Sequence, residues 1–322
     1  MKIVITGACG FIGFHSARKL LELGHSVLGI DNLNDYYDVN LKHERLKILQ
    51  QEQMQFLKSD INDPKTYEAI SAFAPDVFLH LAAQAGVRYA SINPQSYFES
   101  NLSGFFHVLE WIRAHKHVPL VYASSSSVYG NLSQVPFSEA EAADQPESFY
   151  AATKRANELL AISYHKTFGI TARGLRFFTV YGPYGRPDMA YFGFTKALLE
   201  NKPLQVFHEG QARRDFTYIT DIVDGIIGAI FCNKECEVYN LGHSHPHSTL
   251  DLIRCIESYF DKKAVLDFVE GPKGDVNVTF ADTQKAKMDL GFDPKIDLKE
   301  GMKEFLSWYE NYYSVQSLSD CS

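Results

Sequence analysis

The stretch ITGACGFIG, residues 5–13, decides how this chain folds. It places Gly7, Gly10 and Gly13 where a short β-branched run, KIVIT, gives way to residues 12–23, whose apolar positions recur at helical spacing. Glycine is needed where a backbone turns tightly or approaches a ligand closely, and a helix N-terminus offers unpaired N–H groups to phosphates. A strand, a glycine loop and a helix in this order predict a dinucleotide-binding loop, although the spacing is G-x-x-G-x-x-G rather than the commoner G-x-G-x-x-G.

The second expected strand, SVLGID, ends in an acid that bears on the choice of dinucleotide. A carboxylate at Asp31 accepts hydrogen bonds from the adenine-ribose hydroxyls and repels a 2′-phosphate. The pattern therefore favours NAD over NADP. Asn32 follows directly, and Asp60, at the end of the third expected strand, is placed to reach the adenine by the same geometry.

Outward from this unit, short apolar strands alternate with helix-like segments. MQFLKSD, DVFLHLA, PLVYASS and ITARGLRFF continue the strands, and helices are expected over residues 39–53, 64–74, 95–115 and 149–168. This alternation predicts an α/β fold with a Rossmann-type, doubly wound parallel sheet over residues 1–180. Residues 181–322 are expected to form a smaller C-terminal α/β lobe that binds substrate, and the chain can cross between the lobes more than once.

Composition limits the partners. The net charge of −8 disfavours nucleic acid or an anionic membrane as the main partner. No apolar run reaches the length of a membrane span, and five irregularly spaced cysteines indicate free thiols in a reducing cytoplasm. The histidines of GHSHPHS could chelate a metal, but Ser248 and Asp251 are typical of a helix cap, so no metal is expected.

The run YASSSSVYGN, residues 122–131, ends the fifth expected strand. Ligands of open parallel sheets bind beyond the carboxyl ends of the strands, so these hydroxyls stand where catalysis would use them. Downstream, Tyr150 and Lys154 form a Y-x-x-x-K pair on one helix face. A lysine ammonium near a tyrosine hydroxyl favours phenolate and lowers the tyrosine pKa, which suits a general base.

Together, TGACGFIG, the serines before VYG and YAATK resemble the extended short-chain dehydrogenase/reductase family, and within it the nucleotide-sugar epimerases. The finer motifs GIDNLNDYYDVNLKHERL, HLAAQAGVRYA, RFFTVYGPYGRPDMAYF and ARRDFTYITDIV are similar to those of the UDP-glucuronate 4-epimerases. The resemblance implies interconversion of UDP-glucuronate and UDP-galacturonate for polysaccharide biosynthesis, with NAD tightly bound and regenerated. It also implies a homodimer, and the helices expected over residues 95–115 and 149–168 are long enough to pair in a two-fold helical bundle.

The resemblance assigns roles residue by residue. It implies that Ser125, Tyr150 and Lys154 are catalytic. For the cofactor it implies Gly7, Gly10, Phe11, Ile12, Gly13, Asp31, Asn32, Asp60, Ile61, Leu81, Ala82, Ala83 and Asn101, together with Tyr150 and Lys154. For the UDP-sugar it implies Arg88, Ser126, Ser127, Thr179, Arg186, Phe207, Arg214 and Asp275.

A few of these positions indicate which class of sugar the enzyme would accept. A 4-keto uronate is a β-keto acid, and Arg186 is expected to hold its carboxylate because guanidinium binds carboxylate in a fixed fork. Thr179 stands where epimerases of neutral sugars typically carry Asn. Arg214 is expected on the diphosphate and Phe207 against uracil. Pro272 stands where related epimerases carry a second diphosphate-binding arginine, with Lys273 beside it as a substitute.

Three other functions stay open on the residues alone. The first is 4-epimerisation of UDP-glucose or its N-acetylated analogue, which Thr179 and Arg186 oppose. The second is 4,6-dehydration or decarboxylation of a nucleotide sugar. Enzymes of those kinds resemble this family but carry acids just before VYG, where this chain has Ser126 and Ser127. The third is a non-catalytic dinucleotide sensor, which tends to lose the tyrosine or the lysine that this chain retains.

Overall fold

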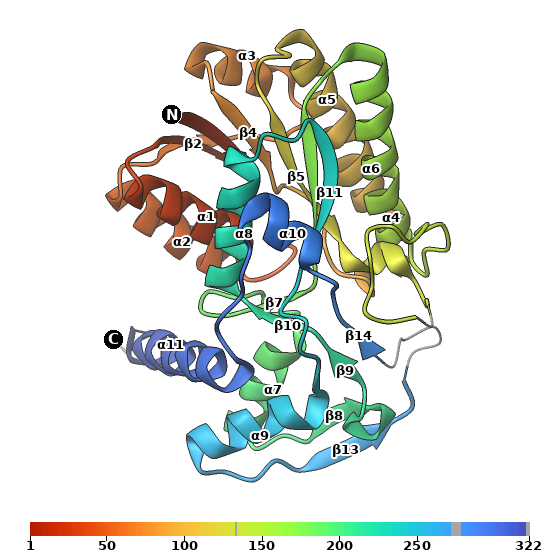
Figure 1. Cartoon of the computed structure of the whole chain (residues 1–322). Coiled ribbons are helices and arrows are strands. Elements are labelled where there is room, and N and C mark those ends of the chain that lie inside the picture. The colour runs from red at the N-terminus through yellow and green to blue at the C-terminus, as the bar shows by residue number, and fades with distance from the viewer. Residues whose placement is uncertain (133, 272–277, 320–322) are drawn as a thin grey trace.

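Seven parallel strands form the central sheet (Figure 1). A computed structural model describes residues 1–132, 134–271 and 278–319 of the chain. Across the sheet the order is β11 (Cys236–Leu241), β6 (Ala172–Phe177), β5 (Leu120–Ser125), β4 (Val77–His80), β1 (Lys2–Thr6), β2 (Ser26–Asp31) and β3 (Gln55–Lys58). Every neighbouring pair is parallel. The predicted Rossmann-type, doubly wound sheet is therefore confirmed.

The strand order reverses direction between β1 and β4, which lie side by side although two other strands separate them in sequence. Open α/β sheets bind ligands at such a switch point, beyond the carboxyl ends of the strands. The glycine loop follows β1, and the serine run ends β5 on the same edge. The topology thus brings the two motifs to one edge of the sheet.

Helices cover both faces of the sheet because strand side chains alternate between the two sides. On one side lie α1 (Phe11–Glu22), α2 (Val39–Gln51) and α8 (Ile219–Phe231), which bury apolar residues in one cluster with Ile3 and Ile5. On the other side lie α3 (Pro64–Phe73), α5 (Gly104–Ala114) and α6 (Phe149–Phe168), and their cluster contains Val4 of the same strand. The continuous apolar runs of the strands reflect burial on both faces.

The segment expected as one helix over residues 95–115 differs in the structure. It consists of α4 (Pro94–Tyr97), a π-helical stretch η2 (Phe98–Ser103) and then α5. Asn101 lies in the π-helical stretch with its side chain buried, and its amide binds the backbone of Gln84 and the hydroxyl of Thr153. π-Helical turns are rare and often occur at functional sites, and apolar periodicity does not reveal them.

The rest of the chain builds the lower part of the molecule in Figure 1 from short paired strands and helices. β7 (Thr179–Tyr181) pairs with β10 (Phe216–Tyr218), and β8 (Leu204–Phe207) pairs with β13 (Leu266–Val269). β9 (Arg213–Arg214) lies between β12 (His247–Ser248) and β14 (Val278–Thr279). The helices are α7 (Ala190–Leu199), α9 (Thr249–Phe260) and α11 (Leu298–Ser319), while α10 (Gln284–Leu290) packs against α8 and β11 beside the main sheet. The expected cap of α9 is present as a capping box between Ser248 and Asp251.

The chain crosses between the two parts more than once. After forming β7 to β10 below the sheet, it returns through α8 to add β11 beside β6, with Tyr239 opposite Leu175. It then leaves again for β12 and α9. Residues beyond 180 therefore contribute a strand to the main sheet, and the division into 1–180 and 181–322 stays a prediction.

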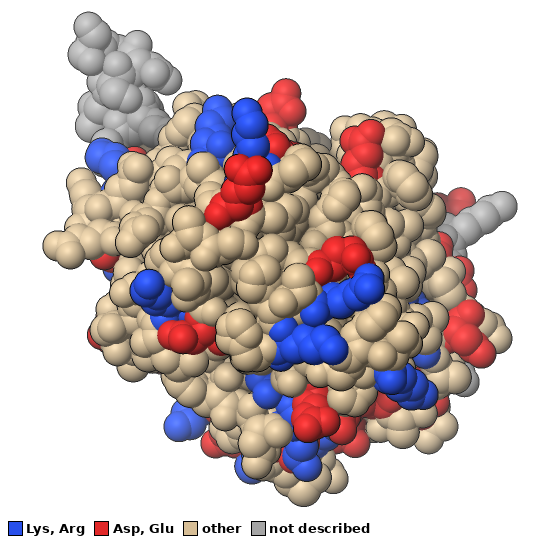
Figure 2. Space-filling model, turned by 90° about the horizontal axis from the view of Figure 1, so that it is seen from above, with Lys and Arg blue, Asp and Glu red and all other residues tan. Residues whose placement is uncertain are grey.

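Among the described residues, no helix is long and apolar enough to cross a membrane. Figure 2 shows the face seen from above in Figure 1. On it, Lys and Arg side chains lie interspersed with Asp and Glu over a mostly uncharged surface.

Candidate active site

A cavity of about 510 Å³ runs along the carboxyl edge of the sheet between its strands and the lower part of the molecule. It brings together residues from β2, β5, β6, β7, α1 and α6 and from the segments that follow β1, β3, β4 and β7. The predicted site residues that line it are Gly7, Gly10, Phe11, Ile12, Gly13, Asp31, Asn32, Asp60, Ile61, Leu81, Ala82, Ala83, Ser125, Ser126, Ser127, Tyr150, Lys154, Thr179, Arg186 and Arg214.

The glycine loop forms a cradle that a larger residue would fill. Gly7 has φ +74°, and a Cβ there would lie 2.7 Å from the backbone nitrogen of Ala82. A Cβ on Gly13 would overlap the carbonyl oxygen of Gly7. The turn lets α1 begin directly behind the loop, with its N-terminal N–H groups at the cavity. This arrangement fits the diphosphate of a dinucleotide.

The acids at the ends of β2 and β3 are held in place by the backbone around them. One oxygen of Asp31 accepts a hydrogen bond from the Cys9 N–H at 3.0 Å, and the other accepts from Leu33 N–H at 2.8 Å. Asn32 donates to Asp60 at 2.8 Å. Burial raises the Asp60 pKa, but hydrogen bonds from its neighbours outweigh this and hold it below its usual value. Both carboxylates are thus available as acceptors for ribose hydroxyls, and the cradle and the acids together fit NAD.

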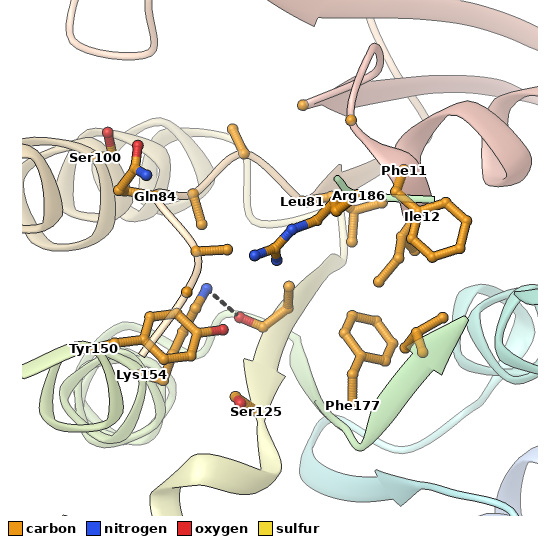
Figure 3. Close-up of a pocket in the computed structure, with 18 of the residues that line it drawn as sticks. Phe11, Ile12, Leu81, Gln84, Ser100, Ser125, Tyr150, Lys154, Phe177 and Arg186 are labelled. Atoms are coloured by element: carbon orange, nitrogen blue, oxygen red, sulfur yellow. Dashed lines mark hydrogen bonds between the residues drawn. The ribbon is translucent and has the colours of Figure 1, made fainter. Parts of the chain in front are cut away.

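The proton-handling groups meet where β5 ends against α6. Ser148 caps α6 by accepting a hydrogen bond from Ala151 N–H at 3.1 Å, and the helix then presents Tyr150 and Lys154 to the cavity. Lys154 Nζ donates to the carbonyl oxygen of Ala123, 2.8 Å away, as the dashed line in Figure 3 shows. Ser125, the last residue of β5, lies on the same side of the cavity.

The electrostatics of this group differ from the sequence expectation in one respect. Burial raises the pKa of Tyr150, and the groups that lower it are Ser125, through a side-chain hydrogen bond, and Arg186, through its charge. Burial also lowers the pKa of Lys154 to about 8, against the attraction of Glu158. Burial outweighs both, so the Tyr150 pKa lies above its ordinary value, and the expected lowering of this pKa by Lys154 stays a prediction.

The four serines have different environments. Ser124 is buried and donates to Glu158 at 2.6 Å. Ser125 donates to the Ser127 hydroxyl at 3.1 Å and accepts from the Ser127 N–H, which starts a short 3₁₀ helix, η3 (Ser126–Tyr129). The run is therefore a strand end followed by a helical turn, and it supplies hydroxyls to the cavity without any carboxylate among residues 124–127.

Arg186 enters the same space from the segment that follows β7. In Figure 3 its guanidinium points toward the region of Tyr150 and Lys154. It forms a two-pronged ion pair with Asp188, and Tyr36 donates a hydrogen bond to that carboxylate at 3.2 Å. Burial lowers the Arg186 pKa, but the Asp188 charge outweighs burial and raises it. The guanidinium therefore stays charged within reach of the proton-handling groups.

Four predicted residues are not among those that line this cavity. Asn101 is absent from the lining, and its amide makes the protein hydrogen bonds that hold η2. Arg88 and Phe207 contact each other instead, with the guanidinium 4.7 Å from the ring centroid. Asp275, like Pro272 and Lys273, lies outside the described residues. The cofactor or substrate roles of these residues stay predictions.

The structure also brings in residues that were not singled out from the sequence. Tyr36, Lys42, Gly86 and Met189 line the cavity. Tyr36 stands in the NDYYD motif, and Asp188 follows Arg186 by two positions in GRPDMA. The motifs pointed to the right segments, but only the fold shows which side chains meet. No group of three or more His, Cys, Asp or Glu suited to a metal occurs within residues 1–132, 134–271 and 278–319.

The fold and the cavity define a dinucleotide-dependent enzyme of the extended short-chain dehydrogenase/reductase class. Residues 3–242 match the NAD dependent epimerase/dehydratase family, and the chain belongs to that family.

The chain is similar to named members of this group along nearly its full length. It is 43% identical over 335 residues to UDP-glucuronate 4-epimerase 6 of Arabidopsis thaliana, covering 98% of this chain and 73% of that protein. It is 42% identical to protein CapI of Staphylococcus aureus, covering 97% and 99% of the two chains. The crystal structure of UDP-glucuronic acid 4-epimerase from Bacillus cereus with UDP-glucuronic acid and NAD matches with a TM-score of 0.91 at 36% identity, covering 97% of this chain and 100% of that one.

Proposed function

We propose that this chain is an NAD-dependent UDP-glucuronate 4-epimerase that forms UDP-galacturonate. The observation that carries the proposal is the presence of the Arg186 guanidinium in one cavity with Tyr150 and Ser125. A cation there suits a sugar that carries a carboxylate, and a hydroxyl beside a tyrosine suits proton transfer at a sugar hydroxyl. The similarity to enzymes named for this reaction supports the same conclusion.

The cofactor is proposed to lie in the glycine cradle. Gly7, Gly10 and Gly13 leave room for the diphosphate, and Asp31 and Asp60 accept hydrogen bonds from the adenosine. When bound, NAD supplies a hydride acceptor at sugar carbon 4 that later returns the hydride, so the net redox change is zero. The chain's own residues then have two tasks, which are to move a proton and to control the substrate carboxylate.

Tyr150 moves the proton. As phenolate it takes the proton of the 4-hydroxyl, directly or through the Ser125 hydroxyl, and it returns a proton to the 4-oxygen after the keto sugar has turned over in the cavity. Burial holds the Tyr150 pKa above its ordinary value, and the Ser125 hydrogen bond and the Arg186 charge offset part of that rise. We expect Lys154, whose ammonium donates to the Ala123 carbonyl, to hold the cofactor ribose and to add positive charge.

Arg186 and Thr179 control the carboxylate. The 4-keto uronate loses carbon dioxide when the bond to its carboxylate aligns with the carbonyl π system. Arg186 can hold the carboxylate in a fixed orientation, and Thr179, at the start of β7, lines the same cavity. The run Ser124 to Ser127 offers no acid to drive elimination. The reaction is therefore expected to stop at epimerisation.

A direct assay tests the function. Purified protein is incubated with UDP-glucuronate without added NAD, and the nucleotide sugars are separated by chromatography. The proposal expects a mixture of UDP-glucuronate and UDP-galacturonate. No UDP-galacturonate, even with NAD added, contradicts it. Turnover of UDP-glucose at an equal kcat/KM would favour the neutral-sugar epimerase instead.

We also propose a homodimer in a reducing compartment. Large apolar side chains are exposed on η2, α5 and α6, namely Phe98, Phe106 and Leu159 at 51%, 46% and 51%. α5 and α6 lie next to each other on one side of the sheet, so a second copy could cover these residues in a helical bundle. Cys9, Cys232, Cys236 and Cys255 are free thiols, which suits the cytoplasm.

A further inference from the structure

The ion pair between Arg186 and Asp188 uses one particular edge of the guanidinium. Arg186 Nε donates to one oxygen of Asp188 at 3.0 Å, and Nη2 donates to the other oxygen. A guanidinium carries five N–H donors, arranged so that two different edges can each grip a carboxylate. Asp188 therefore occupies the Nε/Nη2 edge and leaves the edge formed by Nη1 and the second Nη2 hydrogen.

The remaining edge has no competing acceptor in the described part of the chain. There, Arg186 Nη1 makes no hydrogen bond, and the side chain keeps 22% of its surface exposed. Arg186 is close enough to Tyr150 for each to shift the pKa of the other. The open edge of the guanidinium is thus available to a carboxylate that sits beside Tyr150.

A residue from a distant part of the chain holds the Asp188 carboxylate in place. Tyr36, which comes from the loop after β2, donates to Asp188 Oδ2 at 3.2 Å. Burial and the Asp188 charge raise the Tyr36 pKa to about 12, so the phenol remains a donor. Gly86 packs against the group with φ +103°, and a Cβ there would lie 2.6 Å from the Tyr36 hydroxyl oxygen. The three side chains therefore leave no space for a larger residue at this point.

We infer that Asp188 and Tyr36 are positioning residues that orient Arg186 so that its free edge fixes the carboxylate of the sugar. Their effect is on the outcome of the reaction, because a guanidinium held in one orientation keeps the carboxylate out of line with the C4 carbonyl. The inference rests on the proposed function. It adds that the partition between epimerisation and carbon dioxide loss is set by residues that need not touch the substrate.

The competing reaction has a definite chemistry. When the C5–C6 bond of the 4-keto uronate aligns with the C4 carbonyl, that bond breaks and its electron pair becomes the enolate of C4 and C5. Carbon dioxide leaves, and C5 takes a proton from water, so that a UDP-4-keto-pentose remains. Each passage through this branch releases one carbon dioxide and forms no UDP-galacturonate, and the hydride taken from C4 stays on the cofactor until it is returned to C4 of the keto-pentose.

The test compares Asp188→Asn with the unaltered protein on UDP-glucuronate labelled with ¹³C in the carboxyl group. Labelled carbon dioxide and bicarbonate are measured by NMR, and UDP-galacturonate by chromatography. Asn keeps the size of the side chain but removes the charge that grips the guanidinium. We expect the ratio of carbon dioxide to UDP-galacturonate to rise at least about tenfold, which corresponds to the loss of about one orienting interaction. The KM should not rise, because Arg186 is still present to bind the carboxylate.

Two further variants separate positioning from loss of structure. Tyr36→Phe removes only the hydroxyl that holds Asp188, and we expect a smaller rise in the same ratio. Asp293→Asn is a matched control, since it removes an exposed carboxylate that pairs with Lys287 at 3.1 Å, and it should leave the ratio unchanged. Thermal unfolding shows which variants are folded.

The outcomes are distinct. The inference is overturned if a folded Asp188→Asn protein gives the same ratio of carbon dioxide to UDP-galacturonate as the unaltered protein. An equal slowing of epimerisation and of carbon dioxide loss leaves this ratio unchanged and also overturns it. If Asp188→Asn fails to fold, an unchanged ratio in Tyr36→Phe overturns it. If the unaltered protein forms no UDP-galacturonate, the proposed function itself is wrong, which is a separate result.

Discussion

Arg176 binds both carboxylate oxygens of Glu158 through one edge of its guanidinium, formed by Nε and Nη2. Its Nε and Nη2 each lie 2.8 Å from a different oxygen of Glu158. The pair is buried, with side chains 2% and 0% exposed, and Glu158 also accepts hydrogen bonds from Ser124 and Arg155. Burial raises the Glu158 pKa, but Arg176 outweighs it and holds the pKa below its usual value. This carboxylate ties the end of β5 to the helix that carries Tyr150.

Replacing Glu158 by Gln is expected to destabilise the protein. The amide leaves the buried Arg176 charge without a compensating anion, and breaking a buried pair in this way costs about 3–5 kcal/mol. Urea unfolding measures the change. Glu44→Gln is the matched control, because Glu44 pairs with Lys47 at 3.9 Å on the surface and such pairs contribute about 0–1 kcal/mol. If the two changes lower the free energy of unfolding equally, the buried pair contributes no more to stability than the surface pair.

Lys154 should make stability depend on alkaline pH. Burial lowers its pKa from 10.5 to about 8, so between these values the unfolded chain keeps a proton that the folded chain has released. Stability therefore rises with pH across this window, and below it the buried charge lowers stability by a constant amount. Relative to Lys154→Met, the free energy of unfolding should increase by up to about 3 kcal/mol from pH 8 to 10.5. If the difference in free energy of unfolding between the unaltered protein and Lys154→Met stays constant across this pH window, the low pKa of Lys154 is contradicted.

Tyr150→Phe should nearly abolish turnover without preventing binding. The phenyl ring keeps the packing against Tyr97, whose ring centroid lies 6.0 Å away, but it cannot take a proton. General acid–base groups contribute about 10²–10⁴-fold, so kcat should fall by that factor while the binding constant for UDP-glucuronate changes little. Steady-state kinetics and calorimetric titration measure the two quantities. If kcat of the variant stays within about threefold of the value of the unaltered protein, Tyr150 is not the base.

Gly13→Ala should disrupt the cofactor cradle. Its Cβ would overlap the Gly7 carbonyl oxygen, so the loop must shift away from the position that fits a diphosphate. We expect NAD affinity to fall at least about tenfold, equivalent to about 1.4 kcal/mol. Calorimetry on protein stripped of nucleotide measures this. Gly193→Ala is the matched control, since nothing lies within 4 Å of a Cβ there, and it should bind NAD normally. Equal affinity in both variants would contradict the cradle.

Charged residues on the exposed apolar faces of α5 and α6 should separate the proposed dimer. Phe106→Glu with Leu159→Glu introduces repulsion where two copies are expected to meet. The molar mass measured by light scattering should fall from that of a dimer to that of a monomer. Phe268→Glu, an equally exposed change on β13, should leave the mass unaltered. A monomer mass for the unaltered protein would exclude the dimer.

Much of the fold could be predicted from local patterns. The strand, glycine loop and helix at residues 2–22 follow from apolar periodicity and from glycines that meet the backbone of their neighbours. α6 spans Phe149–Phe168 as expected, because Ser148 caps one end and Gly169 ends the other in the left-handed region. Such signals lie within a few residues of each other, so the sequence shows them directly.

Other features depend on contacts between distant segments. The return of the chain to form β11, and the π-helical stretch around Asn101, arise from pairing with β6 and from hydrogen bonds to Gln84 and Thr153. No periodic pattern records such partners. The same holds for Asn101 itself, whose amide bonds to Gln84 and Thr153, residues from two other segments of the chain.

The sequence by itself determined the dinucleotide-binding sheet, the absence of an acid in the serine run, and the presence of Ser125, Tyr150, Lys154 and Arg186. These follow from residue types at short spacing, which the sequence shows directly. Only the tertiary structure decided how those groups are oriented. Tyr36 and Asp188 stand 152 positions apart and meet only because parallel strands bring their loops to one edge of the sheet. That meeting leaves Arg186 with one edge occupied and the other open.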